Sequence, residues 1–166
     1  GLGGAQFAMP AALDLLRANR EPAETPQAVV LAATDPANPY GTLLKWPETN
    51  ASADKTPADV GRGATRTVGS LVVLVDGLAA GYLRRGERDL LLALPDEEPA
   101  RTRVAQALAR ALIQLALARV EGQRGLFLET INGVRASQHP AARWFVAEGF
   151  AVGAEGLQYR APRIAS

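Results

Sequence analysis

A change of hydrophobic period in the middle of the chain constrains the fold more than any other feature. Residues 67–94, TVGSLVVLVDGLAAGYLRRGERDLLLAL, contain short apolar runs that are separated by turn residues. An Asp-Gly dipeptide at 76–77 is typical of the two-residue turn of a β-hairpin, because both residues tolerate the positive φ that this turn needs. We therefore expect strands at 71–75 and 78–83, followed by a third at 88–94.

Residues 100–121 then switch to the spacing of an amphipathic helix. Its apolar face consists of Val104, Leu108, Ala111 or Leu112, and Leu115. The polar stripe beside that face consists of Arg103, Gln106, Arg110 and Gln114. A helix of this kind has to bury its apolar face against a sheet. The fold class that follows is α+β, with a mostly antiparallel meandering sheet or a small β-barrel packed on one long helix and one or two short helices.

The remaining segments fit around these two features. Pro10 and Pro140 stand where the first turn of a short helix tolerates proline, and an Asn-Gly dipeptide marks a turn at 132–133. The polar stretch 47–66 has no residues that would anchor a core, so we expect a mobile loop. The expected short helices lie at 7–20 and 139–150, and the further strands at 28–33, 41–46, 125–131 and 157–160.

Composition narrows the classes of function. The 166 residues correspond to about one domain with a real core. A formal net charge of +1 provides no bulk attraction for a polyanion, so nucleic-acid affinity would have to come from local arginine clusters. There is no cysteine and His139 is the only histidine, which excludes disulfides, thiolate catalysis and metal clusters built on Cys or His.

The chain also lacks the patterns of a membrane protein. No apolar run approaches the roughly 18 to 20 residues of a membrane span. The first residues, GLGG, do not begin with Met and show no signal-peptide layout. We therefore expect a cytoplasmic fragment of a longer protein, without a membrane partner.

Five segments together resemble one protein family. They are GLGGAQFAMPAALDLLR (1–17), VVLAATDPANPYGTLLKWP (29–47), VVLVDGLAAGYLRRGERDLLLAL (72–94), LFLETINGVRASQHPAARWFVAEGF (126–150) and GLQYR (156–160). In combination they resemble the C-terminal region of the large helicase-related (Lhr) family of bacterial superfamily 2 DNA repair helicases. The resemblance covers nearly the whole chain, although none of the motifs is a catalytic signature. The family usually has Gly-Glu-Gln-Phe near the start, whereas GAQF at 4–7 lacks that glutamate and any role it has.

The resemblance implies an architecture. Lhr proteins carry an ATP-driven helicase core, then tandem winged-helix modules, and end in a β-barrel-like module. Residues 1–20 would then be the helical tail of the last winged-helix module. Residues 27–160 would be the terminal α+β module, with its mobile loop at 47–66.

The resemblance also implies partners. These are the winged-helix modules of the same polypeptide, single-stranded or hybrid-duplex DNA, and a second copy in a homo-oligomer. ATP and Mg²⁺ belong to the helicase core, because this chain contains no G-x-x-x-x-G-K-[ST] loop. No cofactor or metal is expected in the fragment itself.

Asp35, in ATDPANPYG (33–41), is the strongest candidate for an acid with a chemical role. The Lhr C-terminal region is linked to uracil removal from DNA, for which a carboxylate activates a water or stabilises a sugar cation. The alternative is structural, because an Asp before a proline accepts backbone N–H groups in an Asx-turn while Pro36 and Pro39 hold the corner. No Asp follows Asp96, so an aspartate close to the C-terminus is absent.

Other candidates for ligand contacts have equally simple structural roles. Tyr40 and Trp46 could stack on an extruded base, and both suit a core. Glu129 and Asn132 lie near a turn and could hold a ligand, but Asn-Gly is common wherever a turn needs positive φ. His139 precedes a proline at a helix start, where it could contact a phosphate or act as a plain cap.

Arginine side chains form two groups that suit phosphate, because the guanidinium group donates two parallel hydrogen bonds. The expected DNA-binding residues are Arg84, Arg85 and Arg88 at the end of the hairpin, and Arg103 and Arg110, with Arg101 beside them, on the long helix. The alternative is a solvated face. The positive charge of these arginines is partly offset by acidic residues that lie nearby in the sequence, Glu87, Asp89, Glu97 and Glu98.

A second, partial likeness concerns ARWFVAEGF (142–150), which is similar to the late helix and turn of N-acetyltransferases. The Gly-rich phosphate loop of those enzymes precedes a helix, whereas GQRG at 122–125 follows one. Three hypotheses result. The first is a noncatalytic accessory module of an Lhr-type helicase that supports assembly and DNA binding. The second is a part of a uracil-DNA glycosylase resting on Asp35, and the third is a small-molecule acyltransferase.

Overall fold

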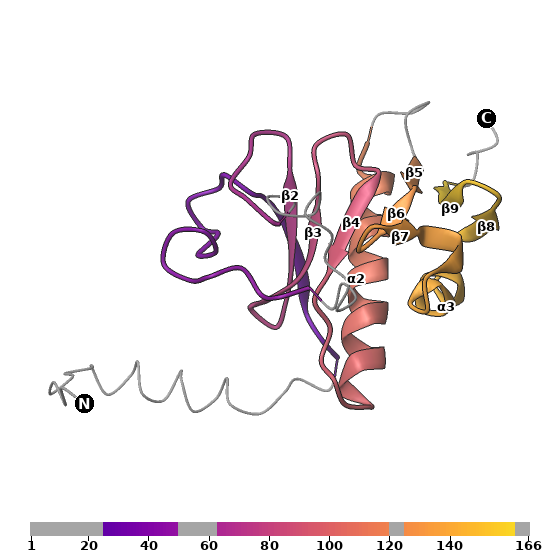
Figure 1. Ribbon diagram of the computed structural model, residues 1–166, viewed down its shortest axis with the longest axis horizontal. Helices are drawn as coiled ribbons and strands as arrows, with labels where there is room; N and C mark the ends of the chain where they lie inside the picture. The colour runs from indigo at the N-terminus through magenta and orange to yellow at the C-terminus, as the bar shows by residue number, and fades with distance from the viewer. Residues whose placement is uncertain (1–24, 50–62, 120–124, 162–166) are drawn as a thin grey trace, which may run out of the picture.

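The computed structural model describes residues 25–49, 63–119 and 125–161, which form an α+β domain (Figure 1). The predicted fold class is confirmed. The first half contains β1 (Ala28–Ala32), β2 (Leu71–Val75), β3 (Leu78–Leu83), β4 (Asp89–Leu92) and α2 (Ala100–Leu117). The second half contains β5 (Gly125–Leu128), β6 (Thr130–Ile131), β7 (Val134–Arg135), the 3₁₀ helix η2 (Ala136–Gln138), α3 (Ala142–Ala147), β8 (Ala151–Gly153) and β9 (Gly156–Arg160).

The strands make two sheets rather than a barrel. The larger sheet has the order β1-β2-β3-β4-β6-β7, and the smaller one has the order β5-β9-β8. All pairings in the larger sheet are antiparallel except β4 with β6, which is parallel. The alternative of a small closed barrel is therefore wrong.

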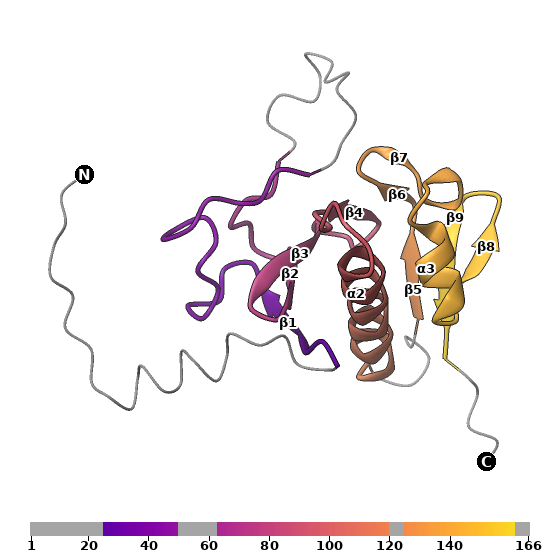
Figure 2. The ribbon, with the colours of Figure 1, turned by 90° about the horizontal axis from the view of Figure 1, so that it is seen from below.

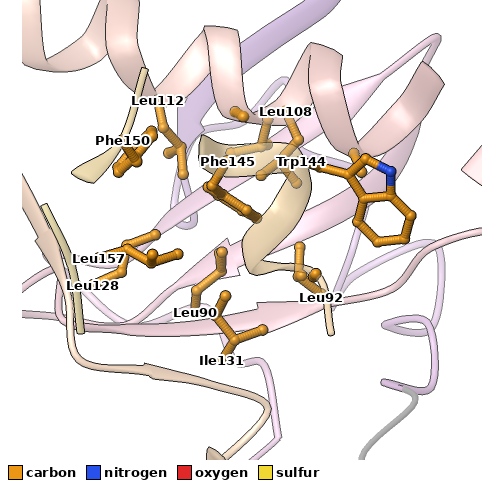
Figure 3. Packing of buried hydrophobic residues seen from close by; sticks show 14 of the residues in the cluster. Leu90, Leu92, Leu108, Leu112, Leu128, Ile131, Trp144, Phe145, Phe150 and Leu157 are labelled. Carbon is orange, nitrogen blue, oxygen red and sulfur yellow. The ribbon is translucent and has the colours of Figure 1, made fainter. Parts of the chain in front are cut away.

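The helix α2 lies between the two sheets. Figure 2 shows β1 to β3 on one side of α2, and α3 with the smaller sheet on the other. Leu108 and Leu112 of α2 are fully buried against Phe145 of α3, Leu90 of β4 and Leu128 of β5 (Figure 3). Burying one such leucine contributes about 1.5–3 kcal/mol, so these contacts hold both sheets to one helix.

One predicted strand is in fact two. The run 125–131 divides at Glu129, so that β5 joins the smaller sheet and β6 the larger. The backbone N–H groups of Glu129 and Thr130 both donate to Arg88 O, at 2.8 and 3.2 Å. These bonds turn the chain out of β5 and place β6 beside β4.

Another predicted strand is wrong. Residues 41–46 form a turn with a single bridge between Tyr40 and Leu44. The N–H groups of Leu43 and Leu44 both donate to Pro39 O at 3.0 Å, which curls the chain instead of extending it.

Other boundaries differ less. The helix expected over 139–150 is confined to α3, with η2 before it, and β8 was not predicted because it is only three residues long. The expected helix at 7–20 and the middle of the 47–66 loop lie outside the described residues. Within the described ranges, neither helix has the length and apolar character to cross a membrane.

Candidate functional site

The candidate site is the corner formed by residues 33–46, which covers the face of the larger sheet opposite α2. Asp35 is half-buried, and its Oδ1 accepts a hydrogen bond from Ala37 N at 2.8 Å. Asn38 N donates to Asp35 O at 3.0 Å. This is the geometry of an Asx-turn, the structural alternative for Asp35.

Asn38 is the polar centre of the corner. Only 1% of its surface is exposed. Its Nδ2 donates to Ala33 O at 2.8 Å, and its Oδ1 accepts from Tyr40 N at 3.1 Å. A buried amide that lost these partners would carry a large desolvation cost, so the side chain is a fixed element of the corner.

Arg66, which lies beyond residues 50–62 in the sequence, holds the corner together. Its Nη1 donates to Asn38 O at 2.7 Å and to Tyr40 O at 3.3 Å. Its Nη2 donates to Thr34 O and Asp35 O, both at 3.0 Å. Nothing in the sequence marks Arg66, because its partners are carbonyl groups 26 to 32 residues away.

The two aromatic candidates have different positions. Tyr40 is 6% exposed, and its hydroxyl accepts a hydrogen bond from Ala79 N at 3.1 Å, so it belongs to the core. The Tyr40 ring stacks on Trp46, with the ring centroids 5.7 Å apart. Trp46 is half-buried and meets the edge of Tyr82 at 5.4 Å. Trp46 and Tyr82, but not Tyr40, line a shallow apolar hollow together with Pro47 and other residues.

The hydroxyl group of Tyr82 lies in a cluster that the sequence reasoning missed. Thr65 Oγ1 is 3.4 Å from Tyr82 Oη and 2.8 Å from Thr67 Oγ1. Burial is the largest single influence and raises the pKa of Tyr82. Hydrogen bonds from Ser70, Thr65 and Thr67 together outweigh it, so the pKa of Tyr82 lies below its ordinary value.

The five candidate arginines do not share one surface. Figure 1 shows the β3–β4 turn, which holds Arg84, Arg85 and Arg88, at the end of the sheet opposite the first turn of α2, where Arg103 lies. Arg110, further along α2, is 2.8 Å from Glu148 Oε1.

At the β3–β4 turn the three side chains have different surroundings. Arg84 is half-buried and Arg85 is exposed. The Arg88 guanidinium is 5.9 Å from the centre of the Phe127 ring and 3.7 Å from Glu129 Oε2. Glu129 thus pairs with an arginine.

Asn132 and His139 have structural partners. Asn132 has φ 51°, its Oδ1 accepts from Leu92 N at 2.7 Å, and its Nδ2 donates to Leu92 O at 3.2 Å. It therefore makes the predicted turn and also extends the hydrogen bonding of β4. His139 Nδ1 accepts from Ala141 N at 3.1 Å just before α3, and burial lowers the pKa of His139. This contact is that of a cap.

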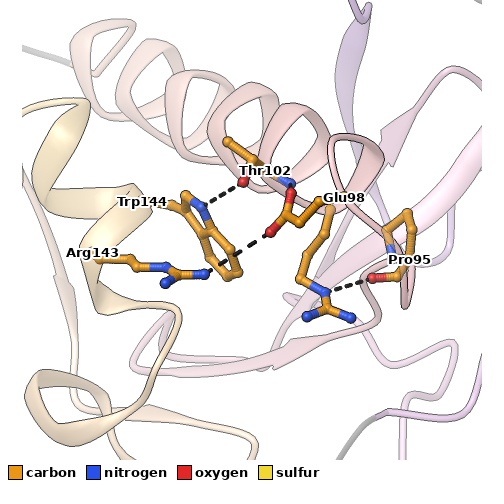
Figure 4. Close-up of polar contacts among 6 residues, drawn as sticks. Pro95, Glu98, Thr102, Arg143 and Trp144 are labelled. Atoms are coloured by element: carbon orange, nitrogen blue, oxygen red, sulfur yellow. Dashed lines mark hydrogen bonds and ion pairs between the residues drawn. The ribbon is translucent and has the colours of Figure 1, made fainter.

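The start of α2 is occupied by a carboxylate (Figure 4). Glu98 Oε2 accepts from Thr102 N at 3.1 Å. A hydrogen bond from the Thr102 side chain is the main cause that lowers the pKa of Glu98, and this backbone bond adds to it. Arg143 lies 4.0 Å from Glu98 and stacks on Trp144 at 4.4 Å. Trp144 Nε1 donates to Thr102 Oγ1 at 3.1 Å. A phosphate group placed here, as an acyl-CoA enzyme would require, would meet the Glu98 charge.

A site for a metal ion was not expected. Across 25–49, 63–119 and 125–161, no three His, Asp or Glu side chains come together in a way that could hold one.

Comparison with known proteins gives the family. No protein-family model matches the chain. It is 46% identical, over 139 residues and 80% of the chain, to a Mycolicibacterium smegmatis protein named Lhr helicase/ probable uracil glycosylase. It is 34% identical, over 164 residues and 96% of the chain, to the Lhr helicase/uracil glycosylase of Escherichia coli. The chain is related to the Lhr helicases.

The match to the Lhr proteins covers a small part of each. The chain spans 8% of the length of the mycobacterial protein and 10% of the Escherichia coli protein. These shares are consistent with a C-terminal region of a large Lhr helicase.

Proposed function

We propose that this chain is a noncatalytic accessory module near the C-terminus of an Lhr-type, ATP-dependent DNA repair helicase. It supports assembly with winged-helix modules of the same polypeptide or with a second copy, and it adds contacts to DNA. In this proposal 27–160 are the accessory module. Residues 1–20, outside the described ranges, are the tail of the preceding winged-helix module. ATP and Mg²⁺ act elsewhere in the longer protein.

The hydrogen bonding of the corner carries the noncatalytic part of the proposal. The Asp35 carboxylate accepts a hydrogen bond from a backbone N–H group. The backbone carbonyl of Asp35 accepts a hydrogen bond from Arg66. A general base has to reach a water or a substrate instead. The polar groups best suited to chemistry therefore hold the backbone of the corner in place.

The edge of the larger sheet supports a role in assembly. β1 has the uncharged sequence AVVLA and, among the described strands, pairs with β2 alone. Val29 is 48% exposed on this strand. Uncharged edge strands of this kind pair with strands of other chains or modules.

Light scattering and a DNA-binding assay on the 166-residue chain test the proposal. Self-association, or association with the purified neighbouring modules, is expected, together with an affinity for single-stranded DNA that falls as salt rises. A strict monomer that binds neither DNA nor those modules would contradict it.

A second candidate function is part of a uracil-DNA glycosylase activity. Two observations favour it: both Lhr relatives have uracil glycosylase in their names, and the rings of Trp46 and Tyr82 line a hollow beside the corner. The test is incubation of the chain with single-stranded DNA that contains uracil. Base release by the native chain that is lost in Asp35→Asn would replace the noncatalytic proposal, and no release would reject the glycosylase.

A further inference from the structure

Two segments distant in the sequence lie side by side at the upper end of the larger sheet in Figure 1. One is residues 63–70, and the other is the β3–β4 turn at 84–88. Arg85 N donates to Ser70 Oγ at 3.1 Å, which joins them. These two segments carry three exposed residues, Thr65, Thr67 and Arg85, and we call them the Thr65–Arg85 surface.

We propose that the Thr65–Arg85 surface binds a phosphodiester group of single-stranded DNA. The inference rests on the proposed contribution to DNA binding and names the residues that make it. Threonine hydroxyl groups and arginine guanidinium groups are among the side-chain groups that contact nucleic-acid phosphates.

The charge of Arg85 is not neutralised by the acids near it in the sequence. The Glu87 carboxylate bonds to Arg119, and Asp89 Oδ1 accepts from Thr130 Oγ1 at 2.7 Å. Both acids are therefore occupied elsewhere. None of the residues in the described ranges provides a hydrogen-bonding or ionic partner for the Arg85 guanidinium.

Gly69 helps to place the Arg85 side chain. Arg85 Cγ lies 3.3 Å from the point that a Cβ on Gly69 would occupy, and Gly69 has φ +84°. The aliphatic part of Arg85 thus packs across this glycine. A side chain anchored along its stem loses less rotational freedom when its head group binds a ligand.

The exposed hydroxyls are positioned from below. The Thr65 hydroxyl forms hydrogen bonds with the hydroxyl groups of Thr67 and Tyr82. Tyr82 is buried, with 5% of its surface exposed. The Tyr82 hydroxyl also bonds to Ser70, so the hydroxyl groups of Thr65 and Thr67 are held in place by a buried polar cluster. The buried Ser70, 2% exposed, fixes Arg85 through its backbone in the same way.

Fluorescence anisotropy with a labelled oligo(dT) strand tests the proposal on the full chain across a range of NaCl concentrations. Arg85→Gln should weaken binding about 5- to 10-fold and reduce the slope of log affinity against log salt by about 0.7, the share of one phosphate contact on a single strand. Thr67→Val should weaken binding about 2- to 5-fold without changing the slope, because it removes a donor and no charge.

Two matched variants serve as controls. Arg110→Gln makes the same change of charge on α2. Thr25→Val removes an exposed hydroxyl group that lies before the first residue of β1, away from the Thr65–Arg85 surface. Neither should lose more than about 2-fold in affinity if the Thr65–Arg85 surface is the contact. Melting temperatures confirm that each variant is folded.

The outcomes separate this inference from the proposed function. If the native chain binds DNA and Arg85→Gln behaves like Arg110→Gln, the surface is wrong while DNA binding stands. If the native chain shows no salt-dependent binding, the DNA-binding part of the proposed function is lost with it. Displacement of DNA by sodium phosphate at matched ionic strength would reassign the surface to free phosphate.

Discussion

Arg66 connects two segments that no strand pairing joins, by donating to four backbone carbonyls of the corner. A lysine has the same charge, but its compact ammonium cannot reach four acceptors arranged around a planar fork. Arg66→Lys should therefore lower the free energy of unfolding by about 1–3 kcal/mol, as expected when carbonyls, most of them partly buried, lose hydrogen bonds from a charged donor. Urea denaturation measures this. Arg85→Lys, on an exposed side chain, is the control and should change stability by less than about 0.5 kcal/mol.

His139 should make stability depend on pH. Its Nδ1 accepts a hydrogen bond from Ala141 N, which requires the neutral ring, and burial lowers its pKa from the ordinary value of about 6.5. The unfolded chain then binds the proton more readily than the folded one. The neutral His139 ring therefore makes its full contribution to the free energy of unfolding above about pH 6.5. This contribution is lost as the pH falls through the lowered pKa of His139 in the folded state.

The measurement for His139 compares urea midpoints at neutral and mildly acidic pH. His139→Asn keeps an oxygen acceptor that does not titrate, so it should lose less stability than the native chain over the same interval. Effects of the carboxylates are common to both proteins and cancel in the difference. An equal loss in both would show that His139 has no part in the pH dependence.

At the scale of elements, the smaller sheet depends on a close approach of β9 to β5. A Cβ on Gly156 would lie 2.1 Å from Leu128 O, and Gly156 has φ +156°. A methyl group on residue 156 would overlap the backbone carbonyl of Leu128, so either β5 or β9 would have to move. Gly156→Ala should therefore destabilise the protein by about 2–4 kcal/mol, measured by thermal or urea unfolding.

The neighbouring strand offers a matched control for that change. Gly153 is paired with Gly156 in the β8–β9 register, and a Cβ on Gly153 would be 3.6 Å from Gly156 O, an ordinary contact. Gly153→Ala should cost less than about 1 kcal/mol. Similar losses for both variants would mean that the β5–β9 approach is not the cause.

At the scale of the molecule, one apolar cluster joins both sheets through α2. Such a core should unfold in a single cooperative transition. The chain has two tryptophans on different sides of α2, Trp46 at the corner and Trp144 on α3. In Trp46→Phe and in Trp144→Phe, the remaining fluorescence should follow the same urea curve as far-UV circular dichroism. In the Trp46→Phe protein, a fluorescence transition at a lower urea concentration than the circular dichroism transition would show that α3 and the smaller sheet unfold by themselves.

The sequence by itself determined the features that depend on neighbouring residues. The Asp-Gly turn between β2 and β3, the Asn-Gly turn after β6 and the amphipathic period of α2 are all present as predicted. The Asx-turn at Asp35 was one of two interpretations of that residue, and its hydrogen bond to Ala37 N spans only two positions. Such features follow from local backbone preferences and from side chains that bond nearby amides.

Only the tertiary structure decided which distant groups meet. The parallel pairing of β4 with β6, the four carbonyls held by Arg66 and the capture of Glu87 by Arg119 all join residues that are far apart in the sequence. It also decided that Arg85, unlike Arg88 and Arg110, has no acidic partner among the described residues. The period of a strand or a helix determines which face of an element is apolar, but not which partner covers that face. That choice depends on the packing of the whole core, in which each contact is favourable only if the others form as well.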